Sequence, residues 1–159
     1  MSTSTDDQTA ALDAWVRLLR GHAALVRDLN AELLHDHALT INDYEALLLL
    51  AHADGGQMRR TDLAQSLQLT PSGVTRLLDG LERAGYVCKA SCDSDGRVTY
   101  AVLTETGREK LDSASASHVA GIEALFAQRY TREELESLAE LLGRLPDAVG
   151  GPSCRAPER

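Results

Sequence analysis

The sequence has few aromatic residues, few cysteines and no long apolar run. Aromatic side chains make up 4% of its 159 residues, whereas apolar residues, mostly leucine and alanine, make up 43%. Leucine and alanine favour helices, so the composition predicts a mainly helical protein. The three cysteines, Cys88, Cys92 and Cys154, are an odd and sparse set that does not resemble a disulfide framework. We expect them to be reduced thiols.

Several functional classes have no signal in this chain. No apolar stretch is long enough to cross a bilayer, and the N-terminus, polar and acidic through Asp6 and Asp7, lacks a signal-peptide pattern. We therefore expect a cytoplasmic protein with no membrane partner. We find no motif that joins a nucleophile to a base, and none of metal-binding carboxylates. The sequence thus predicts no enzyme, no cofactor and no bound metal.

The net charge of −8 at first argues against a nucleic-acid partner, because DNA binding relies on lysine and arginine. The distribution of charge is more informative than its total. Eight basic and seven acidic residues lie between Arg59 and Lys110, a net of +1, so the remaining residues carry −9. The acidity lies outside this central segment, and a locally basic face is compatible with the composition.

Two helices are predicted in the first third of the chain. Apolar residues recur every three or four positions from Leu12 to Leu33, the pattern of one long amphipathic helix. A second helix begins at Thr40, a capping residue with Asp43 in the first turn, and continues through an apolar stretch to Ala51. We expect this second helix to be buried and central.

The next segment has the pattern of a helix-turn-helix. Thr61 is a good N-cap for a short helix over residues 62–67. Thr70 as N-cap and Pro71 in the first helical position then open a helix over residues 71–84. Two helices joined by so short a turn are typical of this motif.

A hairpin and two more helices complete the pattern. Strand candidates at residues 86–89 and 98–102 enclose a turn-rich tip, which predicts a wing. Thr104 caps a helix that runs to about residue 130. Thr131 and Glu134 form a capping box for a last helix that reaches about residue 145.

The predicted fold is a mainly α winged helix-turn-helix with long terminal helices. Its parts are a flexible N-terminus (1–11), one domain (12–145) with the winged helix-turn-helix at 40–103 and dimerisation helices at 12–35 and 104–145, and a disordered tail (146–159).

Several short motifs follow one another in a fixed order. They are Tyr44-Glu45-Ala46-Leu47, Asp62-Leu63-Ala64, Leu69-Thr70-Pro71-Ser72-Gly73-Val74-Thr75-Arg76-Leu77, Gly85-Tyr86-Val87, Asp93-x-Asp95-x-Arg97 and Tyr100-Ala101-Val102-Leu103-Thr104-x-x-Gly107. In order and spacing they resemble the multiple-antibiotic-resistance regulator (MarR) family, over roughly residues 12–145.

The resemblance implies a cytoplasmic homodimer that controls transcription, usually as a repressor, with interlocked terminal helices and two winged heads. It also implies release from double-stranded DNA when a small molecule, often an aromatic or phenolic acid, enters a cleft between the dimer helices and the head. One departure concerns the wing. Many members carry two successive arginines at its tip, whereas Val98 follows Arg97 here. We therefore expect weaker wing contacts than is usual.

The residues expected to read DNA bases are Ser72, Thr75 and Arg76. They occupy the first turns of the second helix of the motif, which meets base edges in the major groove. Arg76 can pair with guanine, Thr75 can offer its methyl group to thymine, and Ser72 can bond to phosphate or base. The competing interpretation is that Ser72 only completes the helix start and Arg76 is a solvated charge.

Other candidates are expected to anchor the protein to the DNA backbone. Arg97 at the wing tip suits the minor groove or a phosphate, and Asp95 is expected to orient an arginine or to form the turn. Arg59, Arg60 and Thr61 precede the motif, the usual place for phosphate contacts, although solvated charge would explain the arginines too.

A candidate effector site lies on the first helix. Trp15 and His22 are seven residues apart and share a face, near where Tyr44 and Glu45 could approach. An aromatic wall with a histidine suits an aromatic acid. Packing in the core or in the dimer is the competing interpretation for Trp15 and His22, and for His118 as well.

Three alternatives stay open. Cys88 and Cys92 flank the wing and could form a redox switch, although the redox-sensing branch of the resembled family has its reactive cysteine near the start of the chain. His35 and His37 with a carboxylate could bind a metal, but this spacing is a weak signal. A winged helix could also be a protein-interaction module.

Overall fold

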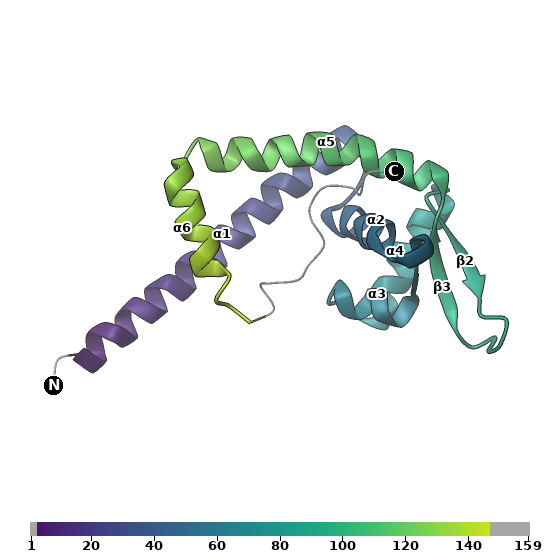
Figure 1. The fold of residues 1–159 in the computed structure, drawn as a ribbon, viewed down its shortest axis with the longest axis horizontal. Coiled ribbons are helices and arrows are strands. Elements are labelled where there is room, and N and C mark those ends of the chain that lie inside the picture. The colour runs from purple at the N-terminus through teal and green to yellow at the C-terminus, as the bar shows by residue number, and fades with distance from the viewer. Residues whose placement is uncertain (1–2, 147–159) are drawn as a thin grey trace.

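Two long helices and a smaller head make up the computed structural model, which describes residues 3–146 (Figure 1). Helix α1 (Thr3–His37) runs diagonally, and its C-terminal part lies along α5 (Glu105–Ala127). The head, with the wing at its outer edge, lies at the other end of α5 from α6 (Arg132–Leu142). The predicted mainly α winged helix-turn-helix fold is confirmed.

Helix α1 is longer than predicted. It begins at Thr3 rather than near Leu12, so the segment expected to be a flexible N-terminus is helical. The physical reason is that no glycine or proline interrupts the chain before Gly21, and the helix continues upstream of its apolar stripe. Of the predicted tail, residues 147–159 lie outside the described residues.

The core lies around α2 (Ile41–His52), the central helix that the apolar run predicted. Its capping box is confirmed, because the Thr40 side chain accepts a hydrogen bond from the Asp43 N–H at 3.1 Å and the Asp43 carboxylate accepts one from the Thr40 N–H at 2.9 Å. Leucines from five helices and from the α1–α2 connection are almost fully buried around it: Leu33, Leu39, Leu47, Leu50, Leu63, Leu78 and Leu111.

The helix-turn-helix consists of α3 (Arg60–Ser66) and α4 (Pro71–Arg83). The predicted start of α4 is confirmed, because the Thr70 side chain accepts a hydrogen bond from the Gly73 N–H at 3.1 Å. The predicted N-cap of α3 is wrong. The cap is the extended residue Arg59, which gives no side-chain capping bond, and Thr61 lies inside the first turn.

The wing is part of a sheet with one more strand than predicted. Strands β2 (Val87–Ser91) and β3 (Thr99–Leu103) form the expected antiparallel hairpin, and β1 (Gln57–Arg59) pairs with the other edge of β3. A three-residue strand is too short to show the alternation by which strands are recognised. Because β1 ends at Arg59, the pairing fixes where α3 begins and holds it beside the wing.

Glycine is required at two joints of the head. Gly85 has φ +80°, the left-handed conformation that ends α4. At Gly107, a β-carbon would overlap the carbonyl oxygen of Tyr86, which itself accepts a hydrogen bond from the Thr104 N–H at 3.1 Å. The first turn of α5 therefore lies directly against the chain that enters the wing.

The last two helices begin as predicted and end earlier. Thr104 caps α5, and Thr131 with Glu134 forms the capping box of α6. Helix α6 ends at Leu142, and no residue within it is buried. No helix in the described part of the chain is both long and apolar enough to span a membrane.

Candidate nucleic-acid interface

Helix α4 has one face in the core and one on the surface. The buried side chains are Val74, Leu78 and Leu81, with Leu77 packed against them. The exposed side chains include those expected to read bases: Ser72, Thr75 and Arg76. Among the described residues, Arg76 has no hydrogen bond or ion pair, so its guanidinium is free to reach a partner. The Ser72 hydroxyl lies 3.2 Å from that of Thr70.

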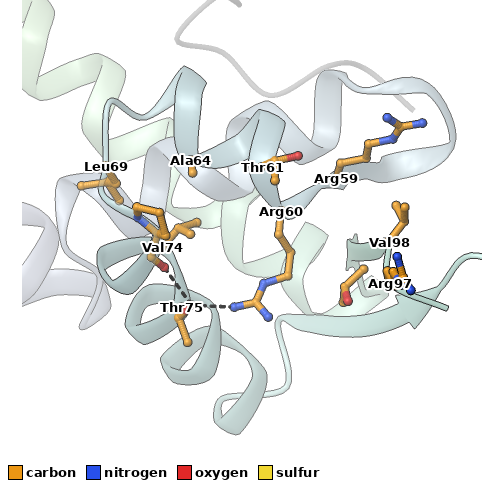
Figure 2. Close-up of a pocket in the computed structure, with 11 residues that line it drawn as sticks. Arg59, Arg60, Thr61, Ala64, Leu69, Val74, Thr75, Arg97 and Val98 are labelled. Carbon is orange, nitrogen blue, oxygen red and sulfur yellow. Dashed lines mark hydrogen bonds between the residues drawn. The ribbon is translucent and has the colours of Figure 1, made fainter. Parts of the chain in front are cut away.

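The hydroxyl of Thr75 is already engaged within the protein. It donates to the carbonyl oxygen of Pro71 at 2.8 Å and accepts from Nη2 of Arg60 at 2.9 Å (Figure 2). A hydroxyl has one proton to donate, so while these bonds hold it cannot donate to a base. What remains available for a base contact is the methyl group of Thr75 and one acceptor lone pair of its hydroxyl.

The wing tip is ordered by Asp95. Its carboxylate accepts a hydrogen bond from the backbone N–H of Arg97 at 3.0 Å, and its carbonyl accepts one from the Val98 N–H at 3.0 Å. Asp95 thus positions the backbone of Arg97 rather than its guanidinium. Within the described residues the Arg97 guanidinium has no ion pair, and the residue is exposed.

Three arginines from different elements line one groove. Arg59 from β1, Arg60 from α3 and Arg97 from the wing surround a space of about 490 Å³, with Thr61 and Thr75 also in its wall (Figure 2). Nε of Arg59 lies 3.4 Å from the hydroxyl of Tyr100 on β3, and this hydrogen bond raises the pKa of Arg59. The structure therefore brings the predicted phosphate-contacting arginines together with the exposed face of α4.

Lys89 is a residue that sequence reasoning missed. From β2 its ammonium contacts Glu82 at 2.9 Å and Asp79 at 3.1 Å, both on α4, and these hydrogen bonds raise the pKa of Lys89. The two ion pairs connect the wing to α4, which is the recognition helix of the motif. They also offset the negative charge of two carboxylates on that helix. No local pattern signals the contact, because it joins two elements.

The candidate effector residues are not brought together within one chain. Trp15, 58% exposed, and His22 lie on the stretch of α1 over residues 11–23, in which every residue is exposed. Tyr44 is buried on α2, where its ring contacts that of His118 at 4.6 Å between centroids. Glu45, the next residue, points outward at a place where partial burial raises its pKa.

Within the described residues, the cysteines and histidines considered for a redox or metal switch form no cluster of three or more side chains that could hold a metal ion. Cys88 is exposed on β2, and Sγ of Cys92 lies 3.1 Å from the Ser94 hydroxyl, whose hydrogen bond lowers the pKa of Cys92. Nδ1 of His35 lies 2.7 Å from the Asp36 carboxylate, and Nε2 of His37 lies 2.6 Å from the Ser117 hydroxyl on α5.

The terminal helices expose large apolar side chains. On α1 the exposed fractions of Leu12, Trp15 and Leu19 are 65%, 58% and 53%. Between α5 and α6 lies a groove of about 500 Å³ that is walled almost wholly by apolar side chains, among them Ile122, Phe126, Leu135, Leu138 and Leu142.

Comparison with known protein families and sequences gives a consistent result. The MarR family model matches residues 37–98, from the end of α1 to the wing. The HTH-type transcriptional repressor YetL of Bacillus subtilis is 31% identical over 96 residues, which are 60% of this chain and 57% of YetL. The match thus spans less than two thirds of that relative's length.

Solved structures resemble nearly the whole fold. AbsC, a MarR family transcriptional regulator from Streptomyces coelicolor, is 33% identical with a TM-score of 0.73, over 82% of this chain and 88% of AbsC. Sco3205 is a MarR family transcriptional regulator from the same organism, solved in complex with DNA. It is 28% identical with a TM-score of 0.74, over 89% of this chain and 92% of Sco3205. CouR from Rhodococcus jostii RHA1, solved with p-coumaroyl-CoA, is 25% identical with a TM-score of 0.68, over 82% of this chain and 90% of CouR.

Proposed function

This chain belongs to the MarR family of transcriptional regulators, and on that premise we propose that it is a sequence-specific DNA-binding regulator that acts as a two-fold dimer. The observation that carries the proposal is the convergence of Arg59, Arg60 and Arg97 on one groove beside the exposed face of α4. In a chain of net charge −8, such a local cluster of cations suits a polyanion. The DNA complex of Sco3205 supports the same interpretation.

In the proposed complex the two parts of the head have different tasks. The first turns of α4 enter the major groove, where Arg76 pairs with guanine, Thr75 offers its methyl group to thymine and Ser72 bonds to base or phosphate. Arg97 carries the wing contact in the minor groove or at a phosphate. Arg59 and Thr61 bind the DNA backbone and fix the register of the head.

The exposed apolar surfaces of the terminal helices support the dimer. A monomer would leave the stripe of α1 and the α5–α6 groove in water, which stable soluble monomers rarely do. A second copy can cover both, and two-fold symmetry then pairs the same surfaces. Two symmetric heads require an inverted-repeat operator whose half-sites lie about 34 Å apart, one turn of DNA.

We further propose that the chain represses transcription and is released by a small aromatic or phenolic acid. YetL is named as a repressor, and CouR binds a ligand with an aromatic acyl group, which supports this chemical class. Trp15 and His22 would contact the ligand. One chain does not bring them beside Tyr44, which is buried, and Glu45, so the partner chain would have to complete the cleft. Such a ligand must favour a dimer whose heads no longer match the operator, because equal affinity for both states shifts nothing.

Fluorescence anisotropy with sheared genomic DNA over a series of salt concentrations tests DNA binding. We expect the affinity to fall steeply with salt, since bound cations release counterions from phosphates. A protein-interaction module would instead leave the anisotropy unchanged at every salt concentration.

Fluorescence of Trp15, the single tryptophan, tests the effector. Benzoate- or phenol-like compounds should quench it over the concentrations that release DNA, and DNA should weaken ligand binding by the same factor, typically about 5–150-fold. His22→Ala should raise the ligand concentration needed and leave ligand-free DNA affinity nearly intact. If no aromatic acid in a broad panel alters DNA binding, the effector belongs to another class.

A further inference from the structure

Two adjacent arginines at the start of the helix-turn-helix are held in different ways. Arg59 is exposed, and its contact with the Tyr100 hydroxyl is long, at 3.4 Å. Arg60 is half-buried, and its Nη2 donates to the Thr75 hydroxyl at 2.9 Å, across the gap between α3 and α4. Sequence reasoning treats both as phosphate contacts, but only Arg60 is bonded to the recognition helix.

The bond to Thr75 fixes the guanidinium at the DNA-facing end of α4. The Thr75 hydroxyl is itself oriented by the Pro71 carbonyl at 2.8 Å, in the first turn of the helix. The chain of bonds from Arg60 through Thr75 to Pro71 therefore specifies one position for a side chain that would otherwise sample many (Figure 2).

The guanidinium keeps most of its donors after this bond. An arginine has five N–H groups, and Thr75 accepts from one of the two on Nη2. Whichever Nη2 proton bonds to Thr75, the other one still forms a parallel pair, either with an N–H of Nη1 or with that of Nε, and such a pair matches O6 and N7 of guanine. A fork that is already oriented loses little freedom on binding, which favours base recognition. A phosphate contact through a single N–H needs no such orientation, whereas reading a base edge does.

We propose that Arg60 is a specificity-determining residue that reads a guanine beside the recognition helix, and that Thr75 is its positioning residue. The inference rests on the proposed DNA-binding function and deepens it. It replaces a uniform phosphate contact at Arg60 with a base contact, while Arg59 keeps the phosphate role. The head would then read each half-site with residues from α3 as well as α4.

The test measures the binding of the full chain to its selected operator and to every single-base variant of it. Arg60→Lys keeps the charge but loses the planar fork, so preference for guanine at one position per half-site should fall about tenfold or more, with the salt dependence preserved. Arg59→Lys is the matched control, and it should leave the ranking of bases at every position unchanged.

Two changes at Thr75 separate positioning from direct contact. Thr75→Val keeps the shape and removes the hydroxyl, so it should reduce preference at the Arg60 position. Thr75→Ser keeps the hydroxyl and removes the methyl group, so it should spare that position and change a neighbouring one.

If the Arg60→Lys variant ranked the affinities of all operator variants as the wild-type protein does, the inference would be overturned while the proposed function stands. The same conclusion would follow if Arg59→Lys changed base preference as much as Arg60→Lys. Wild-type protein without any base preference would remove both the proposed function and the inference.

Discussion

The central leucines of the head are buried, whereas those on the N-terminal half of α1 and on α6 are partly or largely exposed. In the head, Leu47 and Leu63 are 0% exposed, and the helices close around them. On the N-terminal half of α1, Leu12 is 65% exposed, and α6 has no buried residue at all. The head is therefore held by its own core, whereas the N-terminal half of α1 and helix α6 leave apolar side chains exposed, which the proposed dimer would cover. A substitution in each region should break a different property.

The largest effect is expected in the core of the head. Leu47→Ala removes a side chain with no exposure and leaves a cavity, so the free energy of unfolding should fall by about 2–5 kcal/mol. Leu12→Ala, the same change on exposed α1, should cost much less at low protein concentration, where the chain is monomeric and Leu12 stays in water. Urea denaturation followed by circular dichroism measures both. Equal losses would show that α1 is as closely packed as the head.

Substitutions on the terminal helices should weaken dimerisation instead. Leu19→Gln places an amide in the proposed interface, a cost of about 1–3 kcal/mol, so the dimer dissociation constant should rise roughly tenfold or more. Arg20→Gln, which puts the same side chain on the adjacent residue outside the apolar stripe, is the control. Sedimentation velocity distinguishes them. Wild-type protein that is monomeric at micromolar concentration would contradict the proposed dimer.

Within the head, substitutions on the recognition helix and on the wing should change different properties of DNA binding. Arg76→Ala should relax base preference at one position per half-site, with a loss of about 1–3 kcal/mol. Arg97→Ala should weaken binding to all sequences and flatten the salt dependence, because it removes a contact that carries little sequence information. Titrations against operator variants at several salt concentrations measure both. A change of base preference in Arg97→Ala alone would reverse these roles.

The smallest effect is expected where the head meets the terminal helices. His118 on α5 is 7% exposed, and its Nδ1 has no hydrogen-bond partner among the described residues. Burial lowers the pKa of His118, although nearby Glu32 partly opposes this. Its pKa in the folded protein is thus below the value of about 6.5 expected for an unfolded chain.

The unfolded state then binds more protons than the folded state between these two pKa values, so the free energy of unfolding rises with pH there. We expect the contribution of His118 to be fully present above pH of about 6.5 and to be lost as the pH falls from there toward the folded pKa. His118→Phe keeps a ring against Tyr44 and removes the titration, so this part of the pH dependence should disappear. Denaturation at a series of pH values tests it, and an unchanged slope in the variant would exclude His118 as its source.

The same division between the regions explains what could be predicted from sequence. Signals that act within a few residues were sufficient, as with the capping boxes at Thr40 and Thr131 and the start of α4 at Pro71. Thr61 has the chemistry of an N-cap, but the pairing of β1 with β3 starts the helix two residues earlier than predicted. A tertiary contact therefore overrode the local preference.

The residues of the candidate site could be predicted from the sequence, but the contacts between them could not. Arg59, Arg60 and Arg97 could be named from their places around the motif, and the structure brings them to one groove. The bond from Arg60 to Thr75 joins residues fifteen apart on different helices, and the ion pairs of Lys89 join a strand to α4. No spacing rule predicts such contacts, because they depend on how the helices pack.

Selection of random-sequence DNA by the full-length chain, followed by sequencing, tests the central proposal most directly. The account predicts enrichment of an inverted repeat whose half-site centres lie about one helical turn, roughly 34 Å, apart. Guanine should be preferred at defined positions in each half-site, as Arg60 and Arg76 require. Selection that enriches no motif, or only a single unrepeated site, would contradict a dimer that reads DNA with two winged heads.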